Sequence, residues 1–325
     1  MHPAFSVIFL TTLIGVGQGL FLALYTAQGY AALGLLPAQD RLFYAYGSAM
    51  VAVLLIAGLV ASFFHLGHPE RAWRSAAMWR TSWLSREVIV LPAMIGGTMM
   101  YGLVHFLDWE LGVIGITTSV PGDLSLLVGA GTVVVAFALF LCTGMIYACI
   151  KFLQEWASWL TVVNYTLFGL ASGFLLAAAY AAYRAPQLMY FYAAWALIFT
   201  VAVLITRIAS LMRNARIKYK STPQSAIGIR HSRIVQKSQG FMGGSFNTRE
   251  FFHGVKPTLF RAIKWVFLVL VFPLPMLLLW TGVGSDSAVV LLAAFCVQYL
   301  GLLVERWFFF AQANHPQNIY YQTIS

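Results

Sequence analysis

The fold is decided where residues 43–64, FYAYGSAMVAVLLIAGLVASFF, are followed by residues 65–87, HLGHPERAWRSAAMWRTSWLSRE. The first stretch carries no charged residue and is long enough for an α-helix to cross a hydrocarbon layer of about 30 Å. Because a bilayer offers no water to backbone groups, an apolar run of this length must be helical. The two stretches therefore predict a transmembrane helix followed by a short basic loop at one membrane face.

The same alternation of apolar run and polar gap continues along the chain. Hydrophobic residues make up 60% of the sequence and charged residues only 9%, against about 25% charged residues in soluble domains. We predict an all-α polytopic membrane protein, a bundle of eight transmembrane helices that forms one domain over residues 1–325. The first span is predicted to be retained, because its apolar run is too long for a cleaved signal. The predicted spans are 5–34, 43–64, 88–107, 124–147, 160–182, 188–211, 263–283 and 287–310.

The charge distribution predicts the orientation of these spans. All basic residues except Arg41 and Arg184 fall on the side of the N-terminus or at the adjoining helix ends. Lys and Arg are retained on the cytoplasmic side of membrane proteins, so both termini are predicted to be cytoplasmic. The net charge of +10 therefore indicates contact with a membrane surface or a protein partner, and no nucleic-acid-binding fold signature accompanies it.

Two ionisable residues flank the loop between the second and third spans. His65 closes the second span and Glu87 opens the third, so a short connection places both helix ends at the cytoplasmic face. Ionisable groups at the edge of the apolar layer are functional candidates, and a quinone needs a hydrogen-bond donor and a path for protons. Glu87 is equally consistent with a charge that favours the helix dipole. Interfacial Trp and Arg residues in this loop commonly anchor helices to lipid.

Other polar residues near or within the spans suit structural roles. Glu305 and Arg306 are expected to form an ion pair that closes the bundle, and Asn164, Tyr165 and Gln298 to bond between helices. A haem b would need two histidines at similar depth, whereas His65 and His105 fall toward opposite faces. Haem b stays a minor alternative, because His2, His253 and His315 could fold back on the cytoplasmic side. The cysteines lie in apolar runs without metal-ligand spacing, so no metal site is predicted. No repeat of 20–50 residues is visible.

The long gap at about 212–262 is rich in Arg, Lys, Gly and Ser. A loop of this length between spans is commonly functional or disordered. It is predicted either to bind anionic lipid or to form a basic cytoplasmic docking surface for a soluble partner.

Several stretches resemble the dimethyl sulfoxide reductase membrane-anchor family. They are the opening MHPAFSVIFLTTLIGVGQGLFLALY, the stretch HLGHPERAWRS that contains His65, and SREV that contains Glu87. The stretches QSAIGIRHSRIVQKSQGFMGGSFNTREFFHG and ERWFFFAQANHPQN resemble the branch that anchors cytoplasmic sulfite dehydrogenases. The resemblance covers most of the chain and is strongest in the first 90 residues.

The resemblance implies a subunit of a heterotrimer in the bacterial cytoplasmic (inner) membrane. Its partners would be a four-cluster iron–sulfur subunit and a catalytic subunit with molybdenum bis-pterin guanine dinucleotide. The anchor would exchange electrons with ubiquinone or menaquinone and hold no active site for the terminal substrate. By resemblance His65 and Glu87 handle quinol; we add Arg71 and Arg86 of the same loop. Partner docking is assigned to the basic residues Arg74, Arg80, Arg230, Arg233, Lys237 and Arg249.

The function expected from these features is transfer of electrons from sulfite oxidation to quinone. In the dimethyl sulfoxide reductase branch the catalytic subunits lie on the periplasmic face, whereas here the charge bias places the His65–Glu87 face in the cytoplasm. The alternatives are an anchor for a dimethyl sulfoxide or polysulfide reductase, which oxidises quinol, and more remotely a secondary transporter of a small anion. A transporter would be expected to show an inverted repeat and polar groups at the bilayer midplane.

Overall fold

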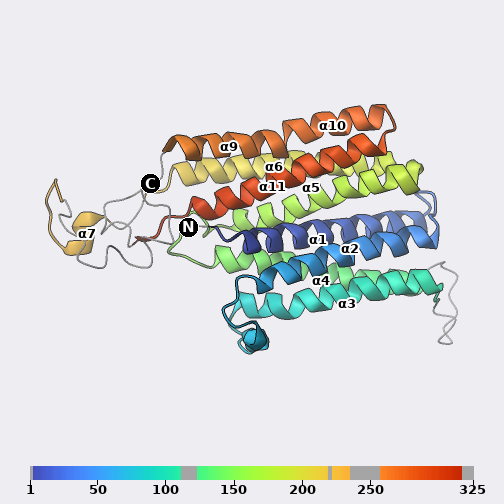
Figure 1. The fold of residues 1–325 in the computed structure, drawn as a ribbon, viewed down its shortest axis with the longest axis horizontal. Coiled ribbons are helices and arrows are strands. Elements are labelled where there is room, and N and C mark those ends of the chain that lie inside the picture. Colours follow the sequence, from blue (N-terminus) through green and yellow to red (C-terminus); the bar gives the residue numbers. More distant parts are fainter. Residues whose placement is uncertain (1–2, 111–122, 219–221, 235–256, 317–325) are drawn as a thin grey trace.

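The computed structural model describes residues 3–110, 123–218, 222–234 and 257–316. In these residues there is no strand, and eight helical segments are long and apolar enough to cross a membrane, which confirms the predicted number of spans. Figure 1 shows them lying side by side in one elongated bundle, with the start of α1 (Phe5–Ala32) and the end of α11 (Ala288–Ala311) at the same end. We call this end the termini end and the opposite one the far end.

The spans form two groups of four. The first group contains α1 (Phe5–Ala32), α2 (Arg41–Phe63), α3 (Trp83–Leu107) and α4 (Asp123–Ala148), with the short helix η1 (Pro69–Ala76) after α2. The second contains α5 (Trp159–Arg184), α6 (Met189–Ala215), α9 (Pro257–Val271), α10 (Pro273–Gly284) and α11 (Ala288–Ala311), with the short helices η3 (Pro186–Leu188) and α7 (Pro223–Ile227). In the first group, α1 and α3 each pack on α2 and α4. In the second group, α5 packs on α6 and α11, and α11 packs on α9 and α10.

Two of the differences from the predicted spans have clear local reasons. The third span begins at Trp83, earlier than predicted, because the Ser82 side chain caps it and accepts a hydrogen bond from the backbone N–H of Ser85. The seventh span is two helices, α9 and α10, that meet at Phe272. Pro273 has no N–H to donate and its ring clashes with the preceding turn, so the helix breaks there.

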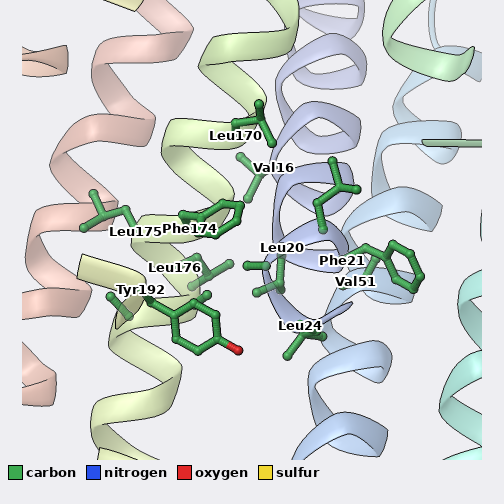
Figure 2. Packing of buried hydrophobic residues seen from close by; sticks show 14 of the residues in the cluster. Val16, Leu20, Phe21, Leu24, Val51, Leu170, Phe174, Leu175, Leu176 and Tyr192 are labelled. Carbon is green, nitrogen blue, oxygen red and sulfur yellow. The ribbon is translucent and has the colours of Figure 1, made fainter. Parts of the chain in front are cut away.

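The core of the bundle lies between α1 and α5. Both helices are buried over most of their length, whereas the other spans bury only one side. Figure 2 shows side chains such as Val16 and Leu20 of α1 and Phe174 of α5 packed between the ribbons at this contact. The bundle is therefore built around a central helix pair, with the remaining spans exposing apolar surface to lipid.

Glycines bring α1 and α5 into direct backbone contact. A Cβ atom added to Gly19 would lie 1.9 Å from the carbonyl oxygen of Gly169, and one added to Gly173 would lie 2.2 Å from the carbonyl carbon of Gly19. Counted from the first residue of each helix, Gly15 and Gly19 of α1 stand at the same positions as Gly169 and Gly173 of α5. The helices run in the same direction (Figure 1), so the glycine pairs occupy equivalent positions in the two groups.

Replacing Gly173 by alanine is expected to destabilise the bundle. The added methyl meets backbone that cannot move aside, and such overpacking costs about 1–3 kcal/mol or more. Gly29, also in α1, provides the control, because nothing lies within 4 Å of a Cβ placed there, and Gly29→Ala should leave the protein as stable or slightly more stable. Thermal unfolding of both variants in detergent measures the difference; equal melting temperatures would contradict the close packing.

Candidate functional site

His65 lies at the termini end, two residues after α2 ends at Phe63. Its side chain is exposed, and the desolvation of part of the ring lowers the pKa of His65 below its ordinary value. The lowered pKa favours the neutral imidazole. An apolar groove of about 330 Å³ between α1 and α2 ends beside it, lined by Ser6, Phe9, Leu13, Ala57, Val60, Ala61 and Phe64.

The loop that follows His65 pairs arginines with tryptophans. Arg74 lies 5.5 Å from the ring centre of Trp73, and Arg80 lies 5.4 Å from that of Trp79. Both tryptophans are exposed, Trp73 by 72% and Trp79 by 53%. Large exposed aromatic side chains next to guanidinium groups are typical of surfaces that meet a membrane interface or a protein partner.

Glu87 lies one turn into α3 and faces the inside of the first group. Its side chain is only 6% exposed, and the Thr143 hydroxyl of α4 donates a hydrogen bond of 2.5 Å to its Oε1. Thr143 is itself buried, so this carboxyl group is enclosed between two helices. A buried carboxyl with one hydroxyl partner can hold or release a proton with little competition from bulk water.

His65 and Glu87 lie at the same end of the bundle but do not touch. Among the interactions of the described residues, no hydrogen bond or ion pair joins the two side chains: His65 faces outward, whereas Glu87 faces α4. The two side chains therefore do not form a directly bonded pair.

A small internal cavity lies next to Thr143, between α1, α4, α5 and α11. Its volume is about 20 Å³, and hydroxyl groups of Thr11, Thr12, Thr143 and Tyr165 line it. That volume holds about one water molecule. Polar groups therefore continue inward from Glu87 through Thr143 into the centre of the bundle.

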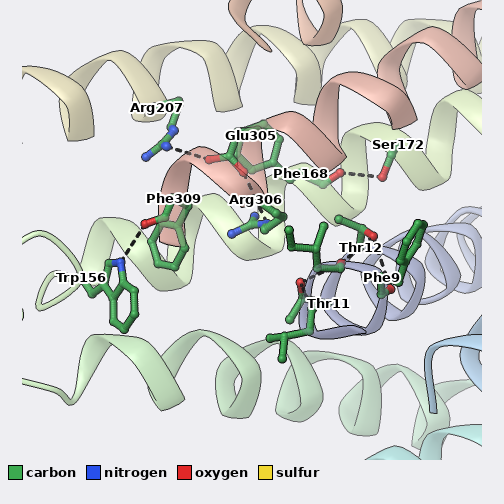
Figure 3. A network of polar contacts seen from close by, with 12 residues as sticks. Phe9, Thr11, Thr12, Trp156, Phe168, Ser172, Arg207, Glu305, Arg306 and Phe309 are labelled. Atoms are coloured by element: carbon green, nitrogen blue, oxygen red, sulfur yellow. Dashed lines mark hydrogen bonds and ion pairs between the residues drawn. The ribbon is translucent and has the colours of Figure 1, made fainter. Parts of the chain in front are cut away.

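A buried cluster of charges stands across this cavity. Glu305 of α11 pairs with Arg207 of α6 at 2.8 Å and with its neighbour Arg306 at 3.4 Å, as Figure 3 shows. The Arg306 guanidinium carbon lies 3.6 Å from the ring centre of Tyr165. All three charged side chains are at most 5% exposed, so they form an ion cluster inside the membrane-spanning region.

The other residues predicted for the site are placed as follows. Arg71 is exposed and lies 3.6 Å from Glu70, which also contacts His68 at 3.1 Å. Arg86 stacks on Trp83 at 4.2 Å and donates hydrogen bonds to the backbone carbonyls of Trp79 and Arg80. Arg86 thus holds the loop in shape, and no contact of the described residues joins either arginine to His65 or Glu87. Arg230 and Arg233 are exposed, whereas Lys237 and Arg249 lie outside the described residues.

Two of the three predicted hydrogen bonds between spans are present, whereas the Tyr165 hydroxyl has no hydrogen-bond partner among the described residues and its ring packs against Arg306. Asn164 of α5 accepts a hydrogen bond of 2.7 Å from Thr206 of α6, and the Gln298 amide lies 3.4 Å from Thr200. The predicted Glu305–Arg306 pair is also confirmed, but Arg207, which lies closer to Glu305 than Arg306 does, was not predicted as a partner. Thr143 was missed as well. Arg207 is a charged residue within a predicted span, which signals that it needs a partner, but only the three-dimensional packing shows that the partner is Glu305. Thr143 does not stand out in the sequence from other hydroxyl residues of the spans.

Comparison with known proteins defines the class. The sequence profile of the DMSO reductase anchor subunit (DmsC) family matches residues 1–311. The chain belongs to this family and is a multi-pass membrane-anchor protein. Among its relatives is the C subunit of the sulfite dehydrogenase of Allochromatium vinosum (strain ATCC 17899 / DSM 180 / NBRC 103801 / NCIMB 10441 / D), which is 56% identical over 325 residues, the full length of both chains. The family resemblance in the sequence is thereby confirmed.

Proposed function

We propose that this protein is the quinone-reactive anchor subunit of a sulfite-oxidising complex in the bacterial cytoplasmic membrane. The observation that carries the proposal is the placement of Glu87, a buried carboxyl with a hydroxyl partner, at the same end as the exposed His65 and the apolar groove. The full-length identity of 56% to the C subunit of a sulfite dehydrogenase supports sulfite as the terminal substrate.

The geometry suits a quinone in three ways. The groove between α1 and α2 offers apolar surface for an isoprenoid tail and ends at Phe64, next to His65. The exposed imidazole is positioned to donate to or accept from a quinone oxygen. Glu87 holds a second proton position away from bulk water, with Thr143 fixing its orientation. Arg71 adds an exposed positive charge to the loop, and Arg86 stabilises the loop itself.

The electrons and protons of the two half-reactions, sulfite oxidation and quinone reduction, balance. Oxidation of sulfite with one water yields sulfate, two protons and two electrons, and reduction of quinone consumes two electrons and two protons. Iron–sulfur clusters and a molybdenum pterin cofactor in the partner subunits would supply the electron path to this chain. His65 and Glu87 would deliver the two protons to the quinone oxygens.

The basic surface supports docking of the partners at the termini end. Arg74 and Arg80 are exposed beside tryptophans in the loop that contains the site, and Arg230 and Arg233 are exposed between α6 and α9. The excess of basic residues at this end supports a cytoplasmic location. An iron–sulfur subunit bound here would lie on the same side of the membrane as the quinone site, which shortens the electron path.

The proposal is tested by purifying the chain with its partner subunits and assaying electron transfer. We expect iron–sulfur absorbance and molybdenum to copurify, and sulfite to reduce a soluble quinone. A complex that oxidises quinol with dimethyl sulfoxide or polysulfide, and does not respond to sulfite, would assign the chain to the reductase alternative. A chain that purifies alone would contradict the anchor role.

Replacing Thr143 by valine is expected to lower quinone-linked turnover about tenfold or more. The change keeps the side-chain shape but removes a hydrogen bond to a carboxyl group, which is worth about 1.5–3 kcal/mol when charged. Thr143→Ser keeps the hydroxyl and serves as the control, which should retain most activity. Steady-state rates with sulfite and quinone give the comparison, and equal rates in the two variants would show that Thr143 does not act through Glu87.

A further inference from the structure

A second, larger polar cavity lies at the far end of the first group. Its volume is about 310 Å³, and it lies between the ends of α1 and α3 and the starts of α2 and α4. Its side chains include Gln28, Arg41, Tyr44, His105, Asp108 and Ser125. The α2 helix of 23 residues separates it from His65, which corresponds to about 35 Å at 1.5 Å per residue. It is therefore distinct from the Glu87 site.

The floor of this cavity is a buried polar network. The Tyr101 hydroxyl donates a hydrogen bond of 2.6 Å to the Gln28 side chain, whose amide in turn donates one of 2.5 Å to Ser125. The rings of Tyr44 and His105 stack at 4.7 Å beside this network. Tyr101 of this network also packs edge-on against His105, with ring centres 4.7 Å apart.

Two polar atoms in this wall have no protein partner. The Tyr44 hydroxyl and His105 Nε2 are buried and form no hydrogen bond with any described residue. Tyr44 is only 3% exposed and His105 only 8%, so bulk water does not reach these atoms freely either. A buried polar group left without a partner costs about 1–3 kcal/mol. Two such groups on adjacent stacked rings, beside a cavity, indicate that the partner comes from the cavity.

The charges around the cavity favour a neutral ligand. Arg41 lies at the rim and is paired with Asp108 at 3.5 Å, and Glu110 also lines the cavity. The lining thus offers no unpaired Arg or Lys among the described residues to attract an anion. The inner groups are a phenol, an imidazole and an amide, between alanine, valine and tryptophan side chains. A planar, neutral ring with hydrogen-bonding oxygens matches this lining.

We propose that this cavity binds the head group of a second quinone, with Tyr44 and His105 hydrogen-bonding to its oxygen atoms. The ligand class rests on the proposed function, since quinone is the planar carbonyl compound that this membrane protein would meet. The volume lies within the range of about 300–1,000 Å³ that is common for small-molecule sites. We assign binding alone to this cavity and no redox step.

Photolabelling of the purified complex tests the second site. The complex in lipid nanodiscs is illuminated with an azido-ubiquinone, and labelled peptides are mapped by mass spectrometry. We expect label in two regions, one around His65–Glu87 and one in the far-end peptides of α2 and α3. In the double variant Tyr44→Phe/His105→Gln, label at the far end should fall at least fivefold while label at the termini end persists. Tyr190→Phe changes an exposed tyrosine at the far end of α6 and should leave both labels unchanged.

Each other outcome has a defined meaning. Label confined to the His65–Glu87 region, or far-end label that the double variant does not reduce, would overturn the second site and leave the proposed function intact. Label in neither region would overturn the second site and the proposed function together. Because the wild-type complex alone distinguishes one labelled region from two, a double variant that fails to fold does not prevent the decision.

Discussion

Replacing Glu87 by glutamine in the assembled complex is expected to reduce quinone-linked sulfite oxidation by about 10²–10⁴-fold. A positioned proton donor or acceptor contributes a factor of this size, and the glutamine amide keeps the shape but exchanges no proton. Replacing His65 by glutamine should lower the same rate, since the exposed imidazole would lose its role toward the quinone oxygen. Turnover with an artificial electron acceptor that bypasses quinone should remain unchanged in both variants.

The loop supplies matched controls for both changes. Glu70 and His68 lie in the same loop, are exposed and pair with each other at 3.1 Å. Glu70→Gln and His68→Gln therefore make the same chemical changes outside the proposed site, and quinone-linked rates should stay near wild type. Wild-type rates in Glu87→Gln and His65→Gln would remove these residues from the mechanism. An equal loss in the control variants would indicate that the loop acts through its overall charge or shape.

Replacing Glu305 by glutamine is expected to lower the free energy of unfolding by about 3–5 kcal/mol. The change leaves the buried Arg207 and Arg306 without a carboxylate, and removal of one partner from a buried ion pair carries a cost of this size. Thermal unfolding of the purified protein, or the yield of folded protein in membranes, measures the loss. Glu70→Gln, which breaks exposed pairs, should change stability by about 1 kcal/mol or less.

A double variant separates charge from packing in this cluster. Arg207→Leu/Glu305→Leu removes one positive and one negative charge, so the net buried charge stays as in the wild type. We expect this variant to be more stable than Glu305→Gln alone, because it leaves one buried arginine, Arg306, without a carboxylate instead of two. If the double variant were the less stable of the two, packing of the long side chains would outweigh their charge.

The number and position of the spans could be predicted from the sequence because the bilayer imposes a minimum apolar length. The Glu305–Arg306 pair and the contacts of Asn164 and Gln298 were predictable for a similar reason, since polar groups inside a membrane must find partners. These rules concern each span on its own. They do not state which helices become neighbours.

The missed features all depend on which face of a helix meets which neighbour. The spans are apolar around most of their circumference, so their sequences carry little signal for the buried face. Arg207 meets Glu305, and Thr143 meets Glu87, across helices distant in sequence. The match between Gly15 and Gly169 likewise emerges only once α1 and α5 are seen in contact. The relation between His65 and Glu87 is a further case, since a shared helix end does not imply contact.

The backbone contact between α1 and α5 bears on how the two groups can move. Alternating-access carriers expose a central site by rocking one half of the molecule against the other. Here the halves meet at glycines so tightly apposed that a relative tilt or slide would drive main-chain atoms into one another. Such a seam disfavours the transporter alternative. It instead suits a rigid scaffold that keeps docked redox centres at constant spacing from the ligand throughout turnover.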